Sequence, residues 1–235
     1  GLTTLDVLAP GRFAGPAAEI LGPPIERLGW EASPADDDRS RQLRGLVLAA
    51  AGTVAAVDHV IAGARALWDA PIDDPAVATA VVVVVSSHGD ADAYAECRER
   101  ARRAETAQVE QRHLRALTRF PGSDEVATLL DELLDGGIRN QDAPYLLRDA
   151  LAHQWHRGFV WQAVTDRWDE VTSRFPSNSI ARMLEGVRSL VDADTDPDVE
   201  AFLQAHPVPQ GSLQVAQHLE RRRVNQRLAE RLATS

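Results

Sequence analysis

The spacing of apolar residues restricts the fold of this chain more than any other feature of its sequence. Along most of the 235 residues, apolar side chains recur at intervals of three and four positions, which places them on one face of an α-helix. One such apolar face is expected to consist of Leu43, Leu46, Val47 and Ala50. Other runs begin at Val57, Val126, Val160 and Ile180, and Val224, Leu228 and Leu232 recur every fourth residue near the end. The pattern predicts an all-α fold.

One apolar segment is compatible with a strand as well as with a helix. Val81–Val85 is an unbroken run of β-branched residues, and propensity alone favours a β-strand. Asp74 and Pro75 before it and Gly89 after it bound a window of helical length, and the chain offers no second strand candidate to pair with it. We therefore expect a buried helix here, with a strand as the alternative.

Residues typical of helix ends separate the apolar runs. Asp74–Pro75 fits an N-cap followed by proline in the first turn, and Ser123–Glu125 fits a cap with two carboxylates at a helix start. Gly89 and Gly136–Gly137 follow helical runs, where a left-handed C-cap favours glycine. The acidic run Asp36–Asp38 and the segment Asp192–Pro197 are interpreted as solvated turns.

The predicted helices form pairs of similar length. The pairs begin, at a spacing of roughly 32 to 37 residues, near Leu43, Pro75, Ala107, Gln141 and Asn178. Short connections favour antiparallel neighbours. We expect a single domain over residues 1–235, with a lead-in over 1–24 and, over 25–235, an α-α superhelix of antiparallel helix pairs of the HEAT or armadillo kind with a concave inner surface.

Charge and composition exclude several classes of function. The chain has 25 basic and 35 acidic side chains, a net charge of −10, and every basic residue is arginine. A surplus of negative charge argues against nucleic acid as a partner, and the apolar runs are too short for a membrane span. The absence of lysine excludes Schiff-base and P-loop chemistry.

The single cysteine, Cys97, excludes a disulfide framework and a cysteine-rich metal site. A reducing, cytoplasmic location is therefore expected, and Cys97 is interpreted as a small buried residue rather than a nucleophile. The sequence opens at Gly1 with neither an initiator methionine nor a signal segment, so we expect a mature or excised piece of a longer protein.

No arrangement of residues in the sequence makes a clear catalytic site. His153 and His156 lie three residues apart and could supply two metal ligands from a helix, but a half-exposed helix face beside Trp155 explains them better. His-Glu-x-x-His, Gly-x-Ser-x-Gly and phosphate-binding glycine loops are all absent. Arg221–Arg223 could bind phosphate or a partner, but a solvated helix surface is the favoured interpretation.

Several short segments, in a fixed order and spacing, resemble a known family. They are the runs Arg41–Gly45 and Ile138–Tyr145, then Trp168–Glu170 with Arg174 and Phe175, then Phe202 with His206–Pro209, and finally Val215–Glu220 with Val224 and Asn225. From about Ile25 to its end, the chain resembles the C-terminal helical domain of zinc aminopeptidases (gluzincins) of the puromycin-sensitive, endoplasmic-reticulum and aminopeptidase N type, in an actinobacterial-like form.

The resemblance implies that catalysis takes place in a different domain from this helical one. In that family the zinc ligands lie in a separate thermolysin-like domain that precedes the helical one, and none of its motifs occurs in this sequence. The resemblance therefore implies no catalytic residue, no metal and no cofactor in this chain. Its implied partners are the upstream catalytic domain of the same protein and peptide substrates. As one domain of a metalloprotease, the chain should have no activity when it is isolated.

The resemblance also implies a wall of a peptide chamber, with cationic side chains that attract the substrate's distal carboxylates. The candidates are Arg139 and Arg182. Gln141 and Asp142 are expected to fix the local loop, and Tyr145 to line the wall. It is equally open that both arginines pair with structural carboxylates such as Asp142 or Glu185. A free-standing helical-repeat scaffold that binds a protein partner is the alternative function.

Overall fold

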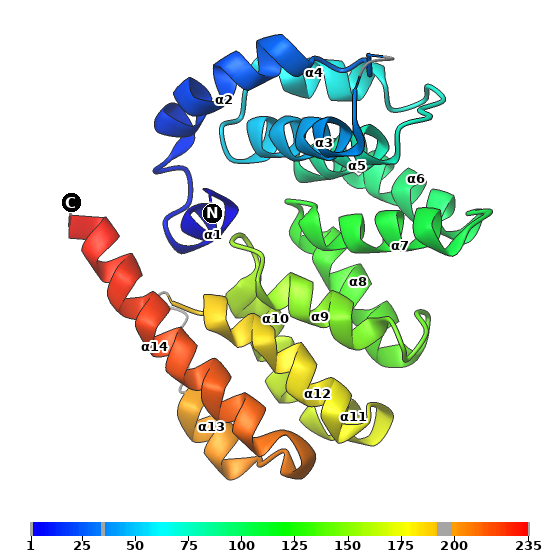
Figure 1. The fold of residues 1–235 in the computed structure, drawn as a ribbon. Helices are drawn as coiled ribbons and strands as arrows, with labels where there is room; N and C mark the ends of the chain where they lie inside the picture. The colour runs from blue at the N-terminus through cyan, green and yellow to red at the C-terminus, as the bar shows by residue number, and fades with distance from the viewer. Residues whose placement is uncertain (1, 34–35, 192–198, 235) are drawn as a thin grey trace. The chain divides into compact units, whose positions relative to one another are not determined.

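A computed structural model describes residues 2–33, 36–191 and 199–234 of the chain (Figure 1). Over these residues it consists of α-helices and short 3-10 helices with no β-strand, which confirms the all-α prediction. The predicted turn Asp192–Pro197 lies outside the described residues. The chain folds into two compact units, Gly1–Phe120 and Pro121–Ser235, and each is treated separately below. The superhelix of a single domain stays a prediction.

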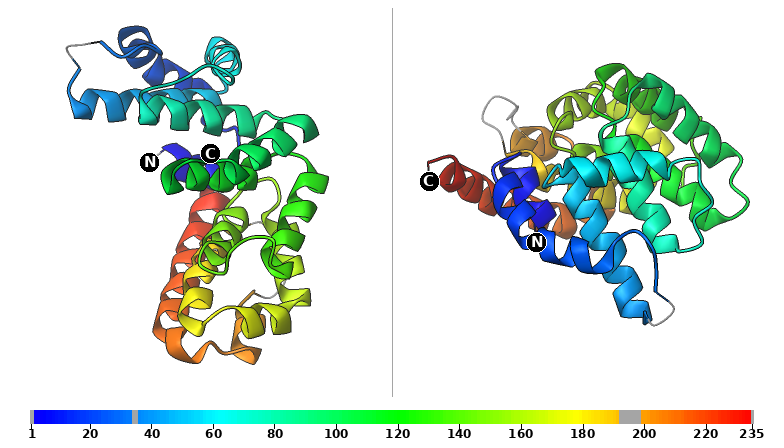
Figure 2. Two further views of the ribbon diagram at one scale, coloured as in Figure 1. Left: turned by 90° about the vertical axis from the view of Figure 1, so that its right-hand side faces the viewer. Right: turned by 90° about the horizontal axis from the view of Figure 1, so that it is seen from above.

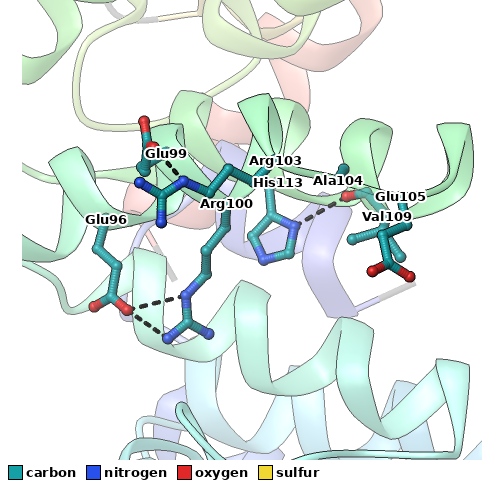
Figure 3. Close-up of a pocket in the computed structure, with 8 residues that line it drawn as sticks. All are labelled: Glu96, Glu99, Arg100, Arg103, Ala104, Glu105, Val109 and His113. Atoms are coloured by element: carbon teal, nitrogen blue, oxygen red, sulfur yellow. Dashed lines mark hydrogen bonds and ion pairs between the residues drawn. The ribbon is translucent and has the colours of Figure 1, made fainter.

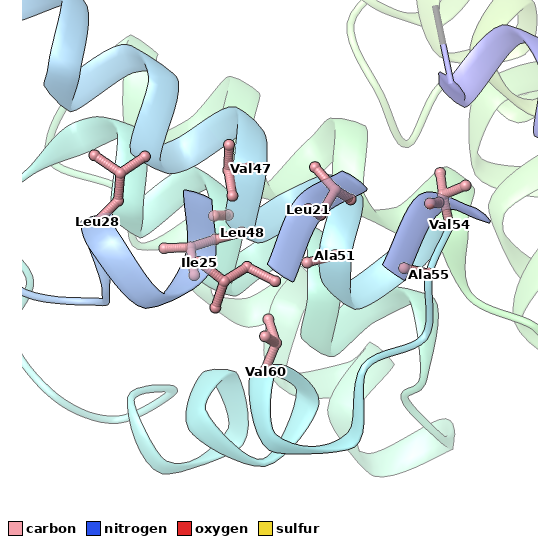
Figure 4. Close-up of a cluster of buried hydrophobic side chains, with 11 residues drawn as sticks. Leu21, Ile25, Leu28, Val47, Leu48, Ala51, Val54, Ala55 and Val60 are labelled. Atoms are coloured by element: carbon pink, nitrogen blue, oxygen red, sulfur yellow. The ribbon is translucent and has the colours of Figure 1, made fainter. Parts of the chain in front are cut away.

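The first unit contains seven α-helices within the described residues. Their bounds are α1 Leu2–Leu8, α2 Ala14–Leu28, α3 Asp38–Thr53, α4 Asp58–Ala66, α5 Pro75–Ser87, α6 Ala91–Arg102 and α7 Ala107–Ala116, followed by the 3-10 turn η1 Leu117–Arg119. Helix α3 packs against both α2 and α5. Figure 4 shows the resulting core, in which Leu21 and Ile25 of α2 lie beside Leu48 of α3 and Val60 of α4.

The orientation of α3 differs from the one predicted. Leu43 and Leu46 are 40% and 69% exposed, whereas Arg44 is 1% exposed and lies in the core. Its guanidinium donates from Nε to the carbonyl of Leu28 at 3.1 Å and from Nη2 to Asp36 at 2.5 Å. Because these bonds turn Arg44 inward, Val47, Leu48 and Ala51 form the buried apolar face.

The acidic run before α3 is more than a solvated turn. Asp36 pairs with Arg44 and also accepts a hydrogen bond from the amide of Ser33 at 2.7 Å. The hydrogen bond from Arg44, followed by the one from Ser33, lowers the pKa of Asp36. Asp37 caps α3 by accepting from the amide of Ser40 at 2.8 Å. These two carboxylates therefore fix the start of α3 and its connection to α2.

The valine run Val81–Val85 is helical, as expected, and lies in the middle of α5. The carboxylate of Asp74 caps this helix by accepting from the amides of Ala76 and Val77 at 2.8 and 3.2 Å, and Pro75 occupies its first turn. Most of α5 is buried, so the packing of valine side chains on both sides outweighs their preference for strands. In α5, burial decides the secondary structure.

Two predicted glycine caps have different explanations. Gly136 follows helix α8 (Ser123–Asp135) with a φ of 103°, in the left-handed region expected of a C-cap. Gly89 does not belong to the glycines with positive φ. A Cβ atom at Gly89 would lie 2.6 Å from the ring of Phe120, so close packing requires glycine there. The N-cap of α8 is Gly122 and not Ser123, one residue earlier than predicted.

The second unit contains the remaining helices. Their bounds are α8 Ser123–Asp135, α9 Ala143–Leu151, α10 Arg157–Asp166, α11 Trp168–Arg174, α12 Ser177–Met183, η2 Leu184–Ser189, α13 Val199–Ala205, η4 Pro209–Gly211 and α14 Ser212–Thr234. The long helix α14 lies along η2 and α12 (Figure 2). The starts of α5, α7, α9 and α12 agree with four of the predicted pair starts to within two residues.

Helix α14 packs through polar residues rather than through the stripe seen in the sequence. Val224 is 39% exposed, whereas His218 and Arg222 are 3% and 2% exposed. Arg222 donates from Nε to the carbonyl of Leu190 at 2.8 Å, and Asn225 donates to the carbonyl of Arg188 at 2.8 Å. The interpretation of Arg221–Arg223 as a solvated surface is therefore wrong for Arg222, whose positive charge caps the end of η2.

In the part of the chain that the structure describes, no single helix has the length and apolar content needed to cross a membrane. Helices α3 and α4 taken together pass on length and composition alone, but they are bent by 115° at the break between them.

Candidate functional site

The five candidate site residues from the sequence all lie in the second unit, four of them around the start of α9. Arg139, Gln141 and Asp142 belong to the turn before this helix, Tyr145 lies in its first turns, and Arg182 comes from α12. Helices α9 and α12 are in contact, which brings Tyr145 and Arg182 together although they are 37 residues apart. Four of the candidate residues thus form two polar pairs, and Gln141 belongs to neither pair.

The first pair braces the turn before α9. Arg139 donates from Nε to Oδ2 of Asp142 at 2.9 Å, and its carbonyl accepts from the amides of Asp142 and Ala143 at 2.9 and 3.0 Å. The side chain of Asp142 is only 12% exposed, whereas that of Arg139 is 54% exposed. These contacts support the structural alternative for Arg139, whose charge is compensated by a neighbouring carboxylate.

The second pair leaves a positive charge on the surface. Nη1 of Arg182 donates to the hydroxyl of Tyr145 at 2.8 Å, and the arginine is exposed. Among the described residues this is the single hydrogen bond of the Arg182 side chain, which makes no ion pair there. Glu185, the carboxylate considered as its partner, pairs instead with Arg188 at 3.0 Å. A neutral hydroxyl therefore orients the guanidinium of Arg182 without neutralising it.

One further arginine, Arg148, lies beside Tyr145 and was not among the candidates from the sequence. The guanidinium carbon of Arg148 lies 5.6 Å from the ring centroid of Tyr145. Nη2 of Arg148 pairs with Asp149 at 2.7 Å, and Nη1 lies 3.9 Å from Glu185. Arg148 follows Tyr145 by three residues, a spacing that places two side chains on one face of a helix and could have identified it.

We call Tyr145, Arg148 and Arg182 the α9–α12 surface. Its two guanidiniums flank one phenol, and that of Arg182 has donor groups available for a ligand. Guanidinium groups bind carboxylates through charge-assisted and often bidentate hydrogen bonds. Gln141 is exposed nearby in the sequence and makes no side-chain hydrogen bond within the described range. The surface is chemically suited to binding a carboxylate, and it carries no nucleophile or general base.

The two histidines considered as metal ligands do not lie on a helix. Both are in the turn between α9 and α10, and Nε2 of His156 lies 2.8 Å from the carbonyl oxygen of Pro121. Across residues 2–33, 36–191 and 199–234, no group of three or more His, Cys, Asp or Glu side chains is placed to hold a metal ion. The family resemblance places zinc in a separate upstream domain, and we derive no step through zinc for the described residues.

Cys97 is a buried core residue, as predicted. Its side chain is fully buried in α6, and Sγ lies 3.5 Å from the carbonyl oxygen of His113. Burial raises the pKa of the Cys97 thiol to about 12. The thiolate needed for nucleophilic attack is therefore not formed near neutral pH.

Comparison with known proteins identifies a family that this chain matches. The family described as "ERAP1-like C-terminal domain" matches residues 8–224. Aminopeptidase M1-A of Oryza sativa subsp. japonica is 24% identical over 224 residues, which cover 90% of this chain and 25% of that protein. Aminopeptidase M1 of Arabidopsis thaliana is 26% identical over 212 residues, covering 85% of this chain and 24% of that protein. The chain spans about a quarter of the length of these curated relatives.

Proposed function

Because this chain belongs to the ERAP1-like C-terminal domain family, we propose that it is the non-catalytic C-terminal domain of a zinc metallo-aminopeptidase. The parent protein removes N-terminal amino acids from peptides in the cytoplasm, and this domain encloses the substrate chamber and contacts the distal part of the peptide. Support comes from the family match over residues 8–224 and from two relatives that are named aminopeptidases.

The proposal assigns catalysis and substrate binding to two different parts of one protein. The upstream catalytic domain holds the zinc and cleaves the peptide bond. This chain holds the substrate at a distance from the cleaved bond, so its contribution is to binding and selection. Binding energy from a remote part of a substrate can lower KM, and it can also raise kcat where it positions the reacting end.

The observation that carries the peptide-binding role is the uncompensated charge of Arg182. This exposed arginine is oriented by the hydroxyl of Tyr145 at 2.8 Å and makes no ion pair with any residue that the structure describes. A carboxylate on the peptide would supply the missing countercharge and accept two of its N–H groups. Arg148, which is already paired with Asp149, would contribute a weaker field.

The test is the Arg182→Ala variant of the full-length enzyme. We expect KM for a peptide to rise roughly fivefold, which corresponds to about 1 kcal/mol for one charge-assisted contact to an exposed group. KM for a single-residue chromogenic amide should not change, because such a substrate does not reach this surface.

Arg221→Ala is the matched control. Arg221 is also exposed and in the same unit, and it makes no polar side-chain contact within the described part of the chain. Its loss should leave both KM values unchanged. Equal increases for peptide and amide in the Arg182→Ala variant would show that Arg182 acts on the fold and would contradict its role in peptide binding.

The alternative, a free-standing scaffold for a protein partner, has less support, because both relatives are named aminopeptidases and match over most of this chain. The two functions differ in what is encoded upstream. A reading frame that continues into a His-Glu-x-x-His domain is expected for the aminopeptidase and not for the scaffold.

A further inference from the structure

The first unit contains a cavity that the proposed function does not use. It has a volume of about 450 Å³ and lies between α6 and α7 (Figure 3). Its walls carry charged and titratable side chains, namely Glu96, Glu99, Arg100, Arg103, Glu105 and His113. We call it the α6–α7 cavity.

The imidazole of His113 is part of the lining of this cavity. The residue is 6% exposed, and its Nδ1 lies 2.9 Å from the carbonyl oxygen of Val109, one helical turn earlier. A carbonyl only accepts, so Nδ1 carries the proton and Nε2 carries the lone pair. In the described part of the chain Nε2 has no hydrogen-bond partner. Figure 3 shows the imidazole between the side chains of Arg100 and Val109.

The surroundings of His113 keep the ring neutral. Burial lowers the pKa of His113 most strongly, the hydrogen bond to Val109 opposes this, and the charges of Arg100 and Arg112 lower it further. The imidazole is therefore an acceptor near neutral pH, and a ligand at Nε2 has to bring its own N–H or O–H group.

Both guanidiniums of the cavity are already paired. Arg100 bonds to Glu96 through Nε at 3.0 Å and through Nη2 at 2.5 Å, and it also pairs with Asp69 at 2.5 Å. It stacks on Trp68 with its guanidinium carbon 4.1 Å from the ring centroid. Arg103 pairs with Glu99 at 2.5 Å. These arginines therefore have little capacity to bind an additional anion.

One carboxylate of the cavity, that of Glu105, is paired with neither of these arginines. Glu105 is exposed, and it makes no hydrogen bond or ion pair with the described residues. With three glutamates against two arginines and a neutral histidine, the lining has a net charge of −1. The groups that remain for a ligand are thus the lone pair on Nε2 of His113 and the negative charge of Glu105. The lining also includes the apolar side chains of Ala104 and Val109.

We propose that the α6–α7 cavity binds the guanidinium group of an arginine side chain from a peptide or protein segment. One N–H group donates to Nε2 of His113, the positive charge pairs with Glu105, and the aliphatic stem packs on Val109. A planar cation with several donors satisfies both groups at once. An anion would instead be repelled by the lone pair of His113 and by the carboxylate of Glu105.

The test is titration of the purified chain with Nα-acetyl-arginine amide, followed by the ¹⁵N resonance of His113 Nε2. The resonance is assigned by its loss in His113→Gln. We expect a saturable shift, and a much smaller one with Nα-acetyl-citrulline amide, which has the same shape without the charge. Glu105→Gln should weaken binding roughly two- to fivefold, the range of one exposed ion pair.

Glu31→Gln is the control, since Glu31 is exposed and does not line the cavity, and it should bind as the unmodified chain does. Because Glu105 is exposed, its substitution tests the proposal even if His113→Gln fails to fold. Equal shifts with arginine and citrulline derivatives, or no shift with either, would overturn the proposal. A shift with Zn²⁺ but not with the arginine derivative would replace it with a metal site.

Discussion

At the scale of single residues, buried polar side chains fix this fold at several points. His218 is a clear case, because both of its ring nitrogens are engaged. Nδ1 accepts from Nε of Arg188 at 3.1 Å, and Nε2 donates to the carbonyl of Ala181 at 3.0 Å. The neutral ring therefore links α14 to η2 and α12, and a proton on Nδ1 would break the contact with Arg188.

This arrangement predicts that stability falls in mild acid. Burial, assisted by the charge of Arg188, lowers the pKa of His218 despite the opposing effects of Ala181 and Glu185. The unfolded state, with a pKa of about 6.5, then binds more protons than the folded state as pH falls below that value. The stabilisation is complete above about pH 6.5 and is lost progressively as pH decreases.

Denaturant unfolding between pH 7.5 and 5.5 measures the effect. His113 has the same sign, because its pKa is also lowered by burial, so His218→Gln should reduce the pH dependence without abolishing it. The variant should also lose about 1 to 3 kcal/mol at pH 7.5, the cost of unsatisfied buried partners. His59→Gln is the control at an exposed site, and an unchanged pH slope in His218→Gln would contradict the assignment.

At the scale of elements, the contact between α3 and α5 depends on one glycine. A Cβ atom at Gly45 would lie 2.6 Å from the carbonyl oxygen of Ala76 at the start of α5. Backbone cannot move aside as a flexible side chain can, so Gly45→Ala should force the two helices apart. We expect a loss of about 1 to 3 kcal/mol in the free energy of unfolding, the usual cost of overpacking.

Gly22→Ala provides the matched comparison. Gly22 lies inside α2, and nothing lies within 4 Å of a Cβ atom placed there. Gly22 precedes Pro23, whose ring disfavours the helical conformation of a preceding residue that carries a Cβ atom. This offsets the entropic gain from alanine, so Gly22→Ala should change the free energy of unfolding by less than about 1 kcal/mol. A larger loss for Gly45→Ala, measured by denaturant unfolding, is expected. Equal effects would show that the approach of α3 to α5 is not what Gly45 permits.

Helix identity could be predicted from the sequence, but helix orientation could not always be. The apolar period and the Asp74 cap were enough to place α5, even though its valines favour strands. In α3 the same period selected Leu43 and Leu46, which are exposed, because Arg44 enters the core to bond with Leu28 and Asp36. A rule that places charged residues outside cannot anticipate an arginine whose partners lie at the end of α2 and in the connection before α3.

At the scale of the whole molecule, the candidate site was predicted in part. The sequence identified Tyr145 and Arg182, and their hydrogen bond depends on the contact between α9 and α12, which no local pattern specifies. It gave the same weight to Arg139, whose carboxylate partner Asp142 lies only three residues away. Local pairing of that kind can be foreseen from spacing, whereas an uncompensated arginine is recognised only when its neighbours are known.

The proposed function makes the chain one part of a larger enzyme, and the two parts meet at the substrate. The chain spans about a quarter of the length of these relatives, and the proposal assigns catalysis to the part outside it. The described residues offer Arg182 for the far end of the peptide. The central claim is therefore that this arginine and the terminal carboxylate of the substrate interact directly.

A double-mutant cycle on the full-length enzyme measures that interaction. The value of kcat/KM is determined for the unmodified enzyme and for Arg182→Ala, each with a peptide that lacks acidic side chains and ends in either a free carboxylate or an amide. We predict a coupling energy of about 1 kcal/mol, so that amidation slows the unmodified enzyme and has little effect on the variant. A coupling energy of zero, with amidation slowing both enzymes equally, would contradict the claim.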